Sequence, residues 1–314
     1  MLKVGFVGVG GISGAHIPAW EAMEETTLVA LCDVRQECLD KYPDKHLYTD
    51  FEEMLEKEQL DILDICLPTY LHADYAVRAM ERGIHVISEK PVSLNAGDVE
   101  RVYTAARENH VNFMVAQVLR FWPEYVLLKD IYDSGKYGRL LSGFMSRLGA
   151  IPKWSWDNWM KDEKRSGLVP YDLHIHDLDF LVYAFGAPRN TQVHRSRRTD
   201  QDYLSVVYEY PDFFITTEAS WYAAPYPFSA GFRFQFEKAI LAYENNRCML
   251  YEVGGEAVDL TEDAQGDTGS INLPKSDAYA NEIRYFTDCV LGKVFPDRVK
   301  PEELDKVIQI LNSL

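Results

Sequence analysis

The sequence has few cysteines, and their arrangement argues against a disulfide framework. The five cysteines are odd in number and scattered over 314 residues, and no two of them form a Cys-x-x-Cys pair. Cys32 and Cys66 stand inside apolar runs, where a thiol serves as a small core side chain. We therefore expect a reduced, soluble, cytoplasmic protein.

Positive charge and long apolar runs are also scarce. Lys and Arg total 32 against 49 Asp and Glu, which gives a formal net charge of −17. Nucleic-acid binding depends on a basic face, so we expect no nucleic-acid partner. We interpret the basic cluster HRSRRTD, residues 194–200, as solvated surface. No run has the length and apolar character of a membrane span, so no membrane partner is expected.

The first residues, MLKVGFVGVGGISGAHIPAW, place a lysine before apolar residues, as a signal peptide does. Glycines at positions 8, 10, 11 and 14 interrupt this run, and an amphipathic helix pattern follows without a small-residue cleavage site. We therefore interpret the segment as a strand that turns into a helix.

The length predicts two domains, because 314 residues exceed what one core usually organises. Over residues 1–119, apolar runs alternate with helical patterns, which predicts a doubly wound parallel sheet of the Rossmann type. Strands are expected at 3–10, 27–34, 61–68, 84–91 and 112–119, and helices at 12–25, 35–42, 51–58, 70–83 and 96–110.

Over residues 120–314 longer alternating strands follow, which predicts an α+β domain with a large open, mainly antiparallel sheet for substrate binding and oligomerisation. An open sheet must cover its second face, so we expect a homodimer or homotetramer formed through this sheet. Strands are expected at 140–151, 191–197, 203–210, 213–222, 232–245 and 247–253, and helices at 123–135, 172–186, 277–292 and 301–314.

The glycines of the first turn indicate a dinucleotide site. Gly8-Val-Gly10-Gly11-Ile12-Ser13 lies between the first strand and the first helix. Gly8 allows a tight turn there, and Gly10 lets a pyrophosphate approach the helix N-terminus. Ser13 replaces a third glycine and is small enough for close helix packing. An ordinary strand-to-helix turn is the alternative.

An acidic residue ends the second predicted strand. Asp33 stands where a carboxylate binds ribose hydroxyls and repels a 2′-phosphate, which favours NAD as the cofactor. Arg35 follows two residues later, and because of it NADP stays an alternative cofactor.

The stretch SEKP, residues 88–91, carries a lysine at the end of a predicted parallel strand. Doubly wound folds bind their ligands at this edge, so Lys90 is a candidate for chemistry, with a solvated loop lysine as the alternative. Its bond to Pro91 is of the type that can be cis.

The stretch YDLHIHDLDF, residues 171–180, carries a candidate pair for proton transfer. Asp172 and His176 are four residues apart and share one face of a helix, which suits a carboxylate and an imidazole that work together. The alternative is that Asp172 caps the helix and His176 packs in the core. His174 points to a different side of a helix than His176, so we expect no metal site.

Three tryptophans precede this helix. PKWSWDNWM places Trp154, Trp156 and Trp159 close together with polar residues between them. Such aromatic faces suit a sugar or a cyclitol, while a hydrophobic lid or an oligomer contact is the alternative.

Taken together, these segments resemble the Gfo/Idh/MocA oxidoreductase family. GVGGISGAH (8–16) is similar to its N-terminal fingerprint, and LPTYLHADYAVRAMERGIHVISEKP (67–91) is similar to its middle block. GLVPYDLHIHDLDFLVYAFG (167–186) is similar to its D-x-G-x-H-x-x-D stretch, although His174 stands where relatives usually carry glycine.

The resemblance implies an NAD(P)-dependent dehydrogenase or reductase that acts on a secondary hydroxyl of a sugar, inositol or related polyol. It implies that Lys90, Asp172 and His176 are catalytic. His176 takes the hydroxyl proton, Lys90 stabilises the oxygen, and Asp172 orients the pair. With the positions named above, the expected cofactor contacts are Gly8, Gly10, Gly11, Ile12, Asp33, Arg35, Pro68, Thr69, His72, Glu89, Lys90 and Gln117, and the expected substrate contacts are Arg120, Trp154, Trp159 and His174.

Two other functions stay open at this point. One is an NAD-dependent glycosidase-type enzyme that oxidises a sugar transiently, and the other is a non-catalytic NAD-binding sugar sensor. The presence of Lys90, Asp172 and His176 argues against the sensor and does not separate the two enzymes.

Overall fold

The structure is a computed structural model of the chain, and it describes residues 1–261 and 276–314. The chain forms two compact units. The first contains Met1–Val118 and the C-terminal stretch that carries α9 (Ala278–Val290) and runs to Ile308. The second begins at Leu119 and includes the last residues of the chain.

The first unit is built on a six-stranded sheet in the order β3-β2-β1-β4-β5-β6. Every pair of neighbouring strands is parallel, which confirms the predicted doubly wound fold. The prediction missed β3, a three-residue strand at the edge of the sheet that is too short to show a pattern. The strands are β1 (Leu2–Val7), β2 (Thr26–Cys32), β3 (His46–Tyr48), β4 (Ile62–Ile65), β5 (His85–Glu89) and β6 (Phe113–Ala116).

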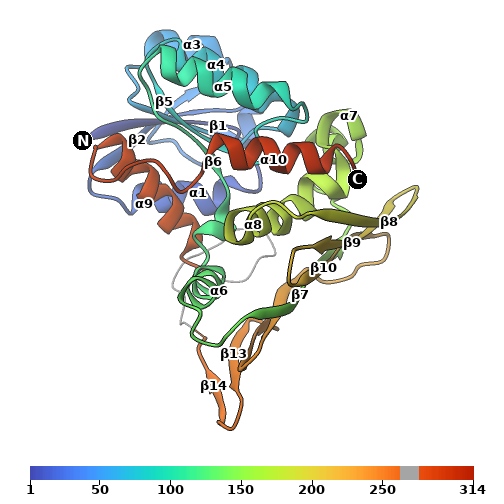
Figure 1. Cartoon of the computed structure of the whole chain (residues 1–314). Coiled ribbons are helices and arrows are strands. Elements are labelled where there is room, and N and C mark those ends of the chain that lie inside the picture. The colour runs from blue at the N-terminus through green and yellow to red at the C-terminus, as the bar shows by residue number, and fades with distance from the viewer. Residues whose placement is uncertain (262–275) are drawn as a thin grey trace. The chain divides into compact units, whose positions relative to one another are not determined.

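Helices cover both faces of this sheet. Three of them lie together on one face, and α1 lies on the other (Figure 1). β4 is buried at every position, as expected for a strand covered on both sides. The helices are α1 (Ser13–Glu21), the short α2 (Gln36–Leu39), and, on the first face, α3 (Phe51–Lys57), α4 (His72–Met80) and α5 (Gly97–Glu108).

Helix α9 packs against α1. The ring centroid of Tyr279 lies 5.6 Å from that of His16, and Arg284 forms an ion pair with Glu25 at 2.6 Å. The sequence division into 1–119 and 120–314 assigns α9 to the second domain, whereas its contacts group it with the first sheet. Sequence order hides this return, because only packing brings α9 to α1. The range 120–314 also includes residues 262–275, which lie outside the described residues.

The second unit is built on an eight-stranded sheet in the order β14-β13-β12-β11-β7-β10-β9-β8. Its neighbouring strands are antiparallel except β7 and β10, so the predicted mainly antiparallel sheet is confirmed. The strands are β7 (Leu140–Ala150), β8 (Asn190–Arg198), β9 (Gln201–Glu209), β10 (Phe214–Tyr222), β11 (Ser229–Phe236), β12 (Ala239–Glu244), β13 (Arg247–Glu252) and β14 (Ala257–Asp259).

One strand prediction in this unit is wrong. Residues 232–245 form parts of two strands, β11 and β12, which pair with each other in an antiparallel hairpin. The chain turns at Glu237 and Lys238, whose backbone N–H groups donate to the carbonyls of Arg139 and Tyr137. The alternation of apolar residues continues on both sides of this turn, so the pattern alone does not reveal it.

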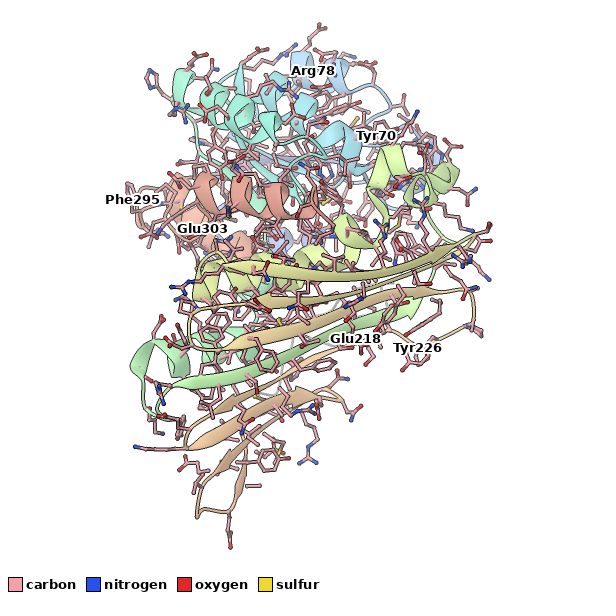
Figure 2. All side chains as sticks on the ribbon, turned by 45° about the vertical axis from the view of Figure 1, so that its right-hand side comes forward. Tyr70, Arg78, Glu218, Tyr226, Phe295 and Glu303 are labelled. Carbon is pink, nitrogen blue, oxygen red and sulfur yellow. The ribbon has the colours of Figure 1, made fainter. Side chains whose placement is uncertain are left out.

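Helices α6 (Pro123–Ser134) and α8 (Ile175–Phe185) cover one face of this sheet. Tyr125 of α6 packs with ring centroids 5.0 Å from Phe180 of α8 and 5.0 Å from Phe232 of β11. On the opposite face, Glu218 of β10, which is labelled in Figure 2, accepts hydrogen bonds from the hydroxyl groups of Ser146 and Tyr203. The sheet therefore has one apolar, helix-covered face and one face of half-buried mixed side chains.

The remaining helices are α7 (Glu163–Ser166) and α10 (Pro301–Leu311). Over residues 1–261 and 276–314, no helix is both long enough and apolar enough to cross a bilayer.

Candidate active site

The first unit brings most of the predicted cofactor residues to one edge of its sheet. β1 pairs with β2 on one side and with β4 on the other, and the direction of the crossovers reverses there. Doubly wound sheets bind ligands at this point, beyond the carboxyl ends of the strands. The residues at this edge are Gly8 after β1, Asp33 after β2, Pro68 and Thr69 beyond β4, Glu89 and Lys90 at the end of β5, and Gln117 after β6.

Gly8 and Gly10 have different roles in the first turn. Gly8 has a φ of +95°, and an added Cβ would lie 2.4 Å from the carbonyl oxygen of Cys66, so only glycine fits. A Cβ on Gly10 would meet nothing nearer than a guanidine nitrogen of Arg35 at 4.0 Å, so the loop is open there. Ser13 begins α1, and its hydroxyl donates to the carbonyl of Gly10 at 2.6 Å. An open loop at a helix N-terminus fits the pyrophosphate of a dinucleotide.

Asp33 and Arg35 form an ion pair at the end of β2. Nε and Nη2 of Arg35 each donate to the Asp33 carboxylate at 3.0 Å, and the backbone N–H of Arg35 donates to it at 2.9 Å. The hydrogen bonds to Asp33 raise the pKa of Arg35. Asp33 and Arg35, the two residues predicted to bear on the choice between NAD and NADP, are therefore paired with each other.

Lys90 stands directly after β5. Its backbone N–H donates to Oε2 of Glu89 at 3.1 Å, and its peptide bond to Pro91 is cis. His72, at the start of α4, lies behind this turn: Nδ1 is 2.7 Å from the carbonyl oxygen of Pro91, and Nε2 is 2.6 Å from that of Leu67. Burial lowers the pKa of His72. The ring therefore ties together the turns that follow β4 and β5, and its contact with the cofactor stays a prediction.

Asp172 and His176 lie in a largely buried segment of the second unit and are its two partly exposed side chains. From Leu168 to Val182 every side chain is buried except these two, which are half-buried. The predicted helix 172–186 is wrong in its first turn, because Asp172 lies in a π-helical turn (Pro170–His174) and α8 begins after it. π-helical turns are frequent at functional sites, and Leu168, just ahead, has a φ of +59° that bulky residues rarely adopt.

Two predicted substrate residues are fully buried in the second unit. His174 stacks on Tyr208 and lies 2.7 Å from its hydroxyl through Nε2, and burial lowers the pKa of His174 to about 3. Arg120 donates to Asp179 through Nε and Nη2 at 2.8 and 2.7 Å, and its guanidinium lies 4.7 Å from the ring centroid of Tyr183. These contacts give both side chains a packing role, and their contact with substrate stays a prediction.

The three tryptophans lie in or next to a short 3-10 segment of the second unit (Trp156–Lys161). Trp154 and Trp156 expose 64% and 44% of their surface, and Trp159 is half-buried. Large indole faces are thus available at the surface.

A buried polar cluster of the first unit escaped the sequence analysis. It contains His16, Trp20, Asp64 and Cys66, and it reaches Glu89 next to Lys90. A signal was present in the sequence, since Asp64 is an acidic residue in the middle of an apolar strand. Buried acids are rare unless a partner satisfies them.

Two family models match the chain. The model of the oxidoreductase family with an NAD-binding Rossmann fold, GFO/IDH/MocA, matches residues 2–117. The model of the GFO/IDH/MocA C-terminal domain matches residues 125–242.

Curated relatives include one hydratase and two dehydrogenases. A 2,7-anhydro-N-acetylneuraminate hydratase from Mediterraneibacter gnavus is 28% identical over 189 residues, 59% of this chain and 50% of that protein. An inositol 2-dehydrogenase from Salmonella typhimurium is 28% identical over 189 residues, 57% of this chain and 53% of that protein. A D-apiose dehydrogenase from Paraburkholderia graminis is 29% identical over 188 residues, which are 59% of this chain and 50% of that protein. The matches span about half the length of these relatives.

Solved structures share the fold along the whole chain. A dehydrogenase from Chromobacterium violaceum has a TM-score of 0.82 at 18% identity, over 100% of this chain and 94% of that one. A levoglucosan dehydrogenase in complex with NADH and levoglucosan has a TM-score of 0.83 at 18% identity, over 99% of this chain and 95% of that one. With two family models matched in sequence order over the greater part of its length, the chain belongs to the GFO/IDH/MocA family of NAD-binding oxidoreductases.

Proposed function

We propose that this protein is an NAD-dependent dehydrogenase or reductase that interconverts a secondary hydroxyl of a sugar, inositol or related polyol and the corresponding ketone. The observation that carries the proposal is the meeting of Gly8, Asp33 and Lys90 at one edge of the first sheet. These residues supply a dinucleotide loop, a carboxylate for ribose and a cation for the reacting oxygen. Membership of a family of NAD-binding oxidoreductases supports the proposal.

The cofactor residues fit NAD. The open loop at Gly10 and the N-terminus of α1 bind the pyrophosphate, and Asp33 accepts hydrogen bonds from the adenosine ribose. Use of NADP requires Arg35 to leave Asp33 and pair with the 2′-phosphate. The other proposed contacts are Gly8, Gly11, Ile12, Pro68, Thr69, His72, Glu89, Lys90 and Gln117.

NAD held by these residues would supply the hydride acceptor, and NADH the hydride donor, while the protein handles the proton. In the oxidation, His176 takes the proton of the substrate hydroxyl while the hydrogen on the same carbon leaves with its electron pair and the carbonyl forms. Lys90 donates a hydrogen bond to that oxygen and stabilises its developing negative charge. Asp172 orients His176 and stabilises the imidazolium. In the reduction each group acts in reverse.

The substrate class rests on the names of the relatives and on the exposed indoles. Inositol 2-dehydrogenase and D-apiose dehydrogenase are named for a cyclitol and a sugar. Trp154 is exposed and Trp159 is half-buried, and we propose that both supply aromatic faces of the kind that pack against such rings. In the same proposal, a second copy of the chain covers the open face of the second sheet, in a homodimer or homotetramer that light scattering would detect.

The test is the absorbance of reduced nicotinamide, measured with NAD and NADP separately over inositols, hexoses and sugar acids. We expect NAD reduction with at least one compound, and Lys90→Ala to lower kcat by about 100-fold or more while NADH binding changes by less than about threefold. Lys41→Ala, at an exposed lysine of the same unit, is the control. Activity of Lys90→Ala close to that of the wild type would overturn the assignment.

A second function is favoured by one relative. The Mediterraneibacter gnavus protein is named a hydratase, and addition of water involves no net oxidation. In this version the same residues serve a transient oxidation of a sugar, loss of a glycosidic group and re-reduction. It would give no net absorbance change, and glycosidic cleavage by the NAD-loaded protein would appear in product chromatography.

A further inference from the structure

A chain of buried polar contacts runs from α1 to Lys90. The indole N–H of Trp20 donates to Oδ2 of Asp64 at 2.7 Å, and the same oxygen lies 2.9 Å from Nδ1 of His16. Nε2 of His16 lies 3.2 Å from Oε1 of Glu89. The other carboxylate oxygen of Glu89 accepts the backbone N–H of Lys90 at 3.1 Å. The imidazole is therefore two contacts away from the lysine.

The geometry favours a charged imidazole. The side chains of His16 and Asp64 are fully buried, and that of Glu89 is 12% exposed. A neutral imidazole carries one N–H and can donate to one carboxylate, whereas here each ring nitrogen faces a carboxylate. The imidazolium donates to both, and one positive charge between two negative charges satisfies the rule that buried charges are paired.

The groups around His16 support the same conclusion. Asp64 faces it from β4, Glu89 from β5, Cys66 from the turn after β4, and Tyr279 from α9. Burial would lower the pKa of His16, but Cys66 and Asp64 outweigh burial and raise it well above its ordinary value. Burial would raise the pKa of Glu89, but the hydrogen bond and charge of His16 outweigh burial and lower it.

A metal site is the competing interpretation of this cluster. One ligand atom each from His16, Asp64 and Cys66 lies within 4.8 Å of the others. Metal binding needs the deprotonated forms of these ligands. Both ring nitrogens of His16 already meet carboxylates, and Asp64 already accepts the N–H of Trp20, so two of the three groups are engaged in hydrogen bonds. The cluster is therefore satisfied as a hydrogen-bonded network.

We propose that His16 is a positioning residue, which holds Glu89 as a carboxylate bound to the imidazole through one oxygen and to the backbone N–H of Lys90 through the other. The proposal rests on the proposed function, because it acts through Lys90. Without the imidazolium, the Glu89 carboxylate is released to pair with the Lys90 ammonium, which withdraws that charge from the substrate oxygen. The loss therefore falls on kcat and leaves cofactor binding in place.

The experiment compares His16→Gln, the double variant His16→Gln/Glu89→Gln, and the control His46→Gln. His46 also contacts a carboxylate of the first unit, at 2.7 Å from Glu58, but its side chain is 67% exposed. We expect His16→Gln to lower kcat about tenfold, with KM for NAD changed by less than about threefold. We also expect it to raise the apparent pKa of the acid limb in the pH profile of kcat. The double variant regains part of kcat because the released carboxylate is gone, and His46→Gln behaves as the wild type.

Two readouts do not depend on turnover. Nitrogen-15 shifts of the histidine rings in the wild type are expected to show one imidazolium at pH 8 that is absent from His16→Gln. Labelling of Lys90 by an amine reagent, followed by peptide mass spectrometry, is expected to be slower in His16→Gln. A neutral His16 ring at pH 7, or unchanged kcat, pH profile and labelling in His16→Gln, overturns the proposal.

The same experiment separates this proposal from the proposed function. Full activity of Lys90→Ala removes the role of the lysine, and with it the proposed function. Loss of activity in Lys90→Ala together with wild-type kinetics in His16→Gln removes only the positioning role. Should His16→Gln fail to fold, the ring shifts of the wild type still decide the charge on His16.

Discussion

His16 in the first unit and His174 in the second are both fully buried, yet their surroundings act in opposite directions. His16 lies between two carboxylates, and its pKa is raised well above the ordinary value. His174 stacks on Tyr208, and burial followed by the nearby charge of Arg147 lowers its pKa to about 3. Burial favours the neutral ring in both places, so the partner decides the charge.

The polar groups around the two rings also differ in where they lead. The contacts of His16 end at the backbone of Lys90, on the ligand-binding edge of a sheet. Those near His174 stay between α8 and the second sheet, where Arg147 donates to Asp177 at 3.0 Å and Tyr208 meets the ring. A buried polar network thus leads to the lysine proposed to react in one unit, and stays within the packed interior in the other.

The largest effect is expected from removal of the acid that pairs with His16. Asp64→Leu leaves the imidazole with one carboxylate and the Trp20 N–H without its acceptor, so the free energy of unfolding should fall by about 4 kcal/mol. Urea denaturation at neutral pH measures it. The control Asp44→Asn, at a side chain that is 69% exposed, should leave the midpoint unchanged, and a similarly small effect of Asp64→Leu would contradict a charged network.

A comparable ion pair in the second unit, Arg120 with Asp179, tests whether burial of the pair explains the loss of stability in both units. Arg120→Leu leaves Asp179 as an unpaired buried carboxylate, and we expect a loss of about 3 kcal/mol in the free energy of unfolding. Arg120→Leu/Asp179→Leu should recover part of it. An unchanged urea midpoint in Arg120→Leu, with weaker substrate binding, would instead favour the substrate role of Arg120.

The pH dependence of stability separates the two histidines directly. The pKa of His174 is about 3 in the folded protein and 6.5 ordinarily, so the unfolded state binds more protons and stability falls as the pH drops below 6.5. This group contributes a slope of up to about 1.4 kcal/mol per pH unit. His174→Gln should flatten the fall in urea midpoint between about pH 6.5 and 5.5. Parallel curves for wild type and variant would exclude the effect.

The contribution of His16 to stability changes above pH 6.5, whereas that of His174 changes below it. The raised pKa of His16 gives stability that is fully present below pH 6.5 and is lost as the pH rises through the folded-state pKa. His16→Gln should therefore remove part of the alkaline fall in stability, which urea denaturation between about pH 7 and 9 measures.

The smallest effect is expected for an exposed ion pair. Arg247 of β13 donates to Asp259 of β14 at 2.7 Å, and both side chains are largely exposed. Water and salt screen such pairs, so Arg247→Ala should leave the urea midpoint within experimental error. A clear loss would mean that ion pairing by itself, without burial, stabilises this protein.

Much of the fold follows from local patterns in the sequence. The apolar runs between helices predicted the parallel sheet, and the alternating strands predicted the mainly antiparallel one. The turn at Glu237 and Lys238 was missed because alternation continues across it, and the π-helical turn at Asp172 was missed because it keeps helical spacing. The return of α9 to α1 depends on packing between segments far apart in the chain.

The sequence by itself determined the two sheets, the glycine turn, the acid after β2 and the lysine after β5, because each is encoded by spacing within a short stretch of chain. Only the tertiary structure decided the state of the buried histidines. His16 meets its two carboxylates 48 and 73 residues away, and His174 meets Tyr208 at a separation of 34. A pKa depends on the charges and burial that surround a group in space, and the fold alone brings those groups together.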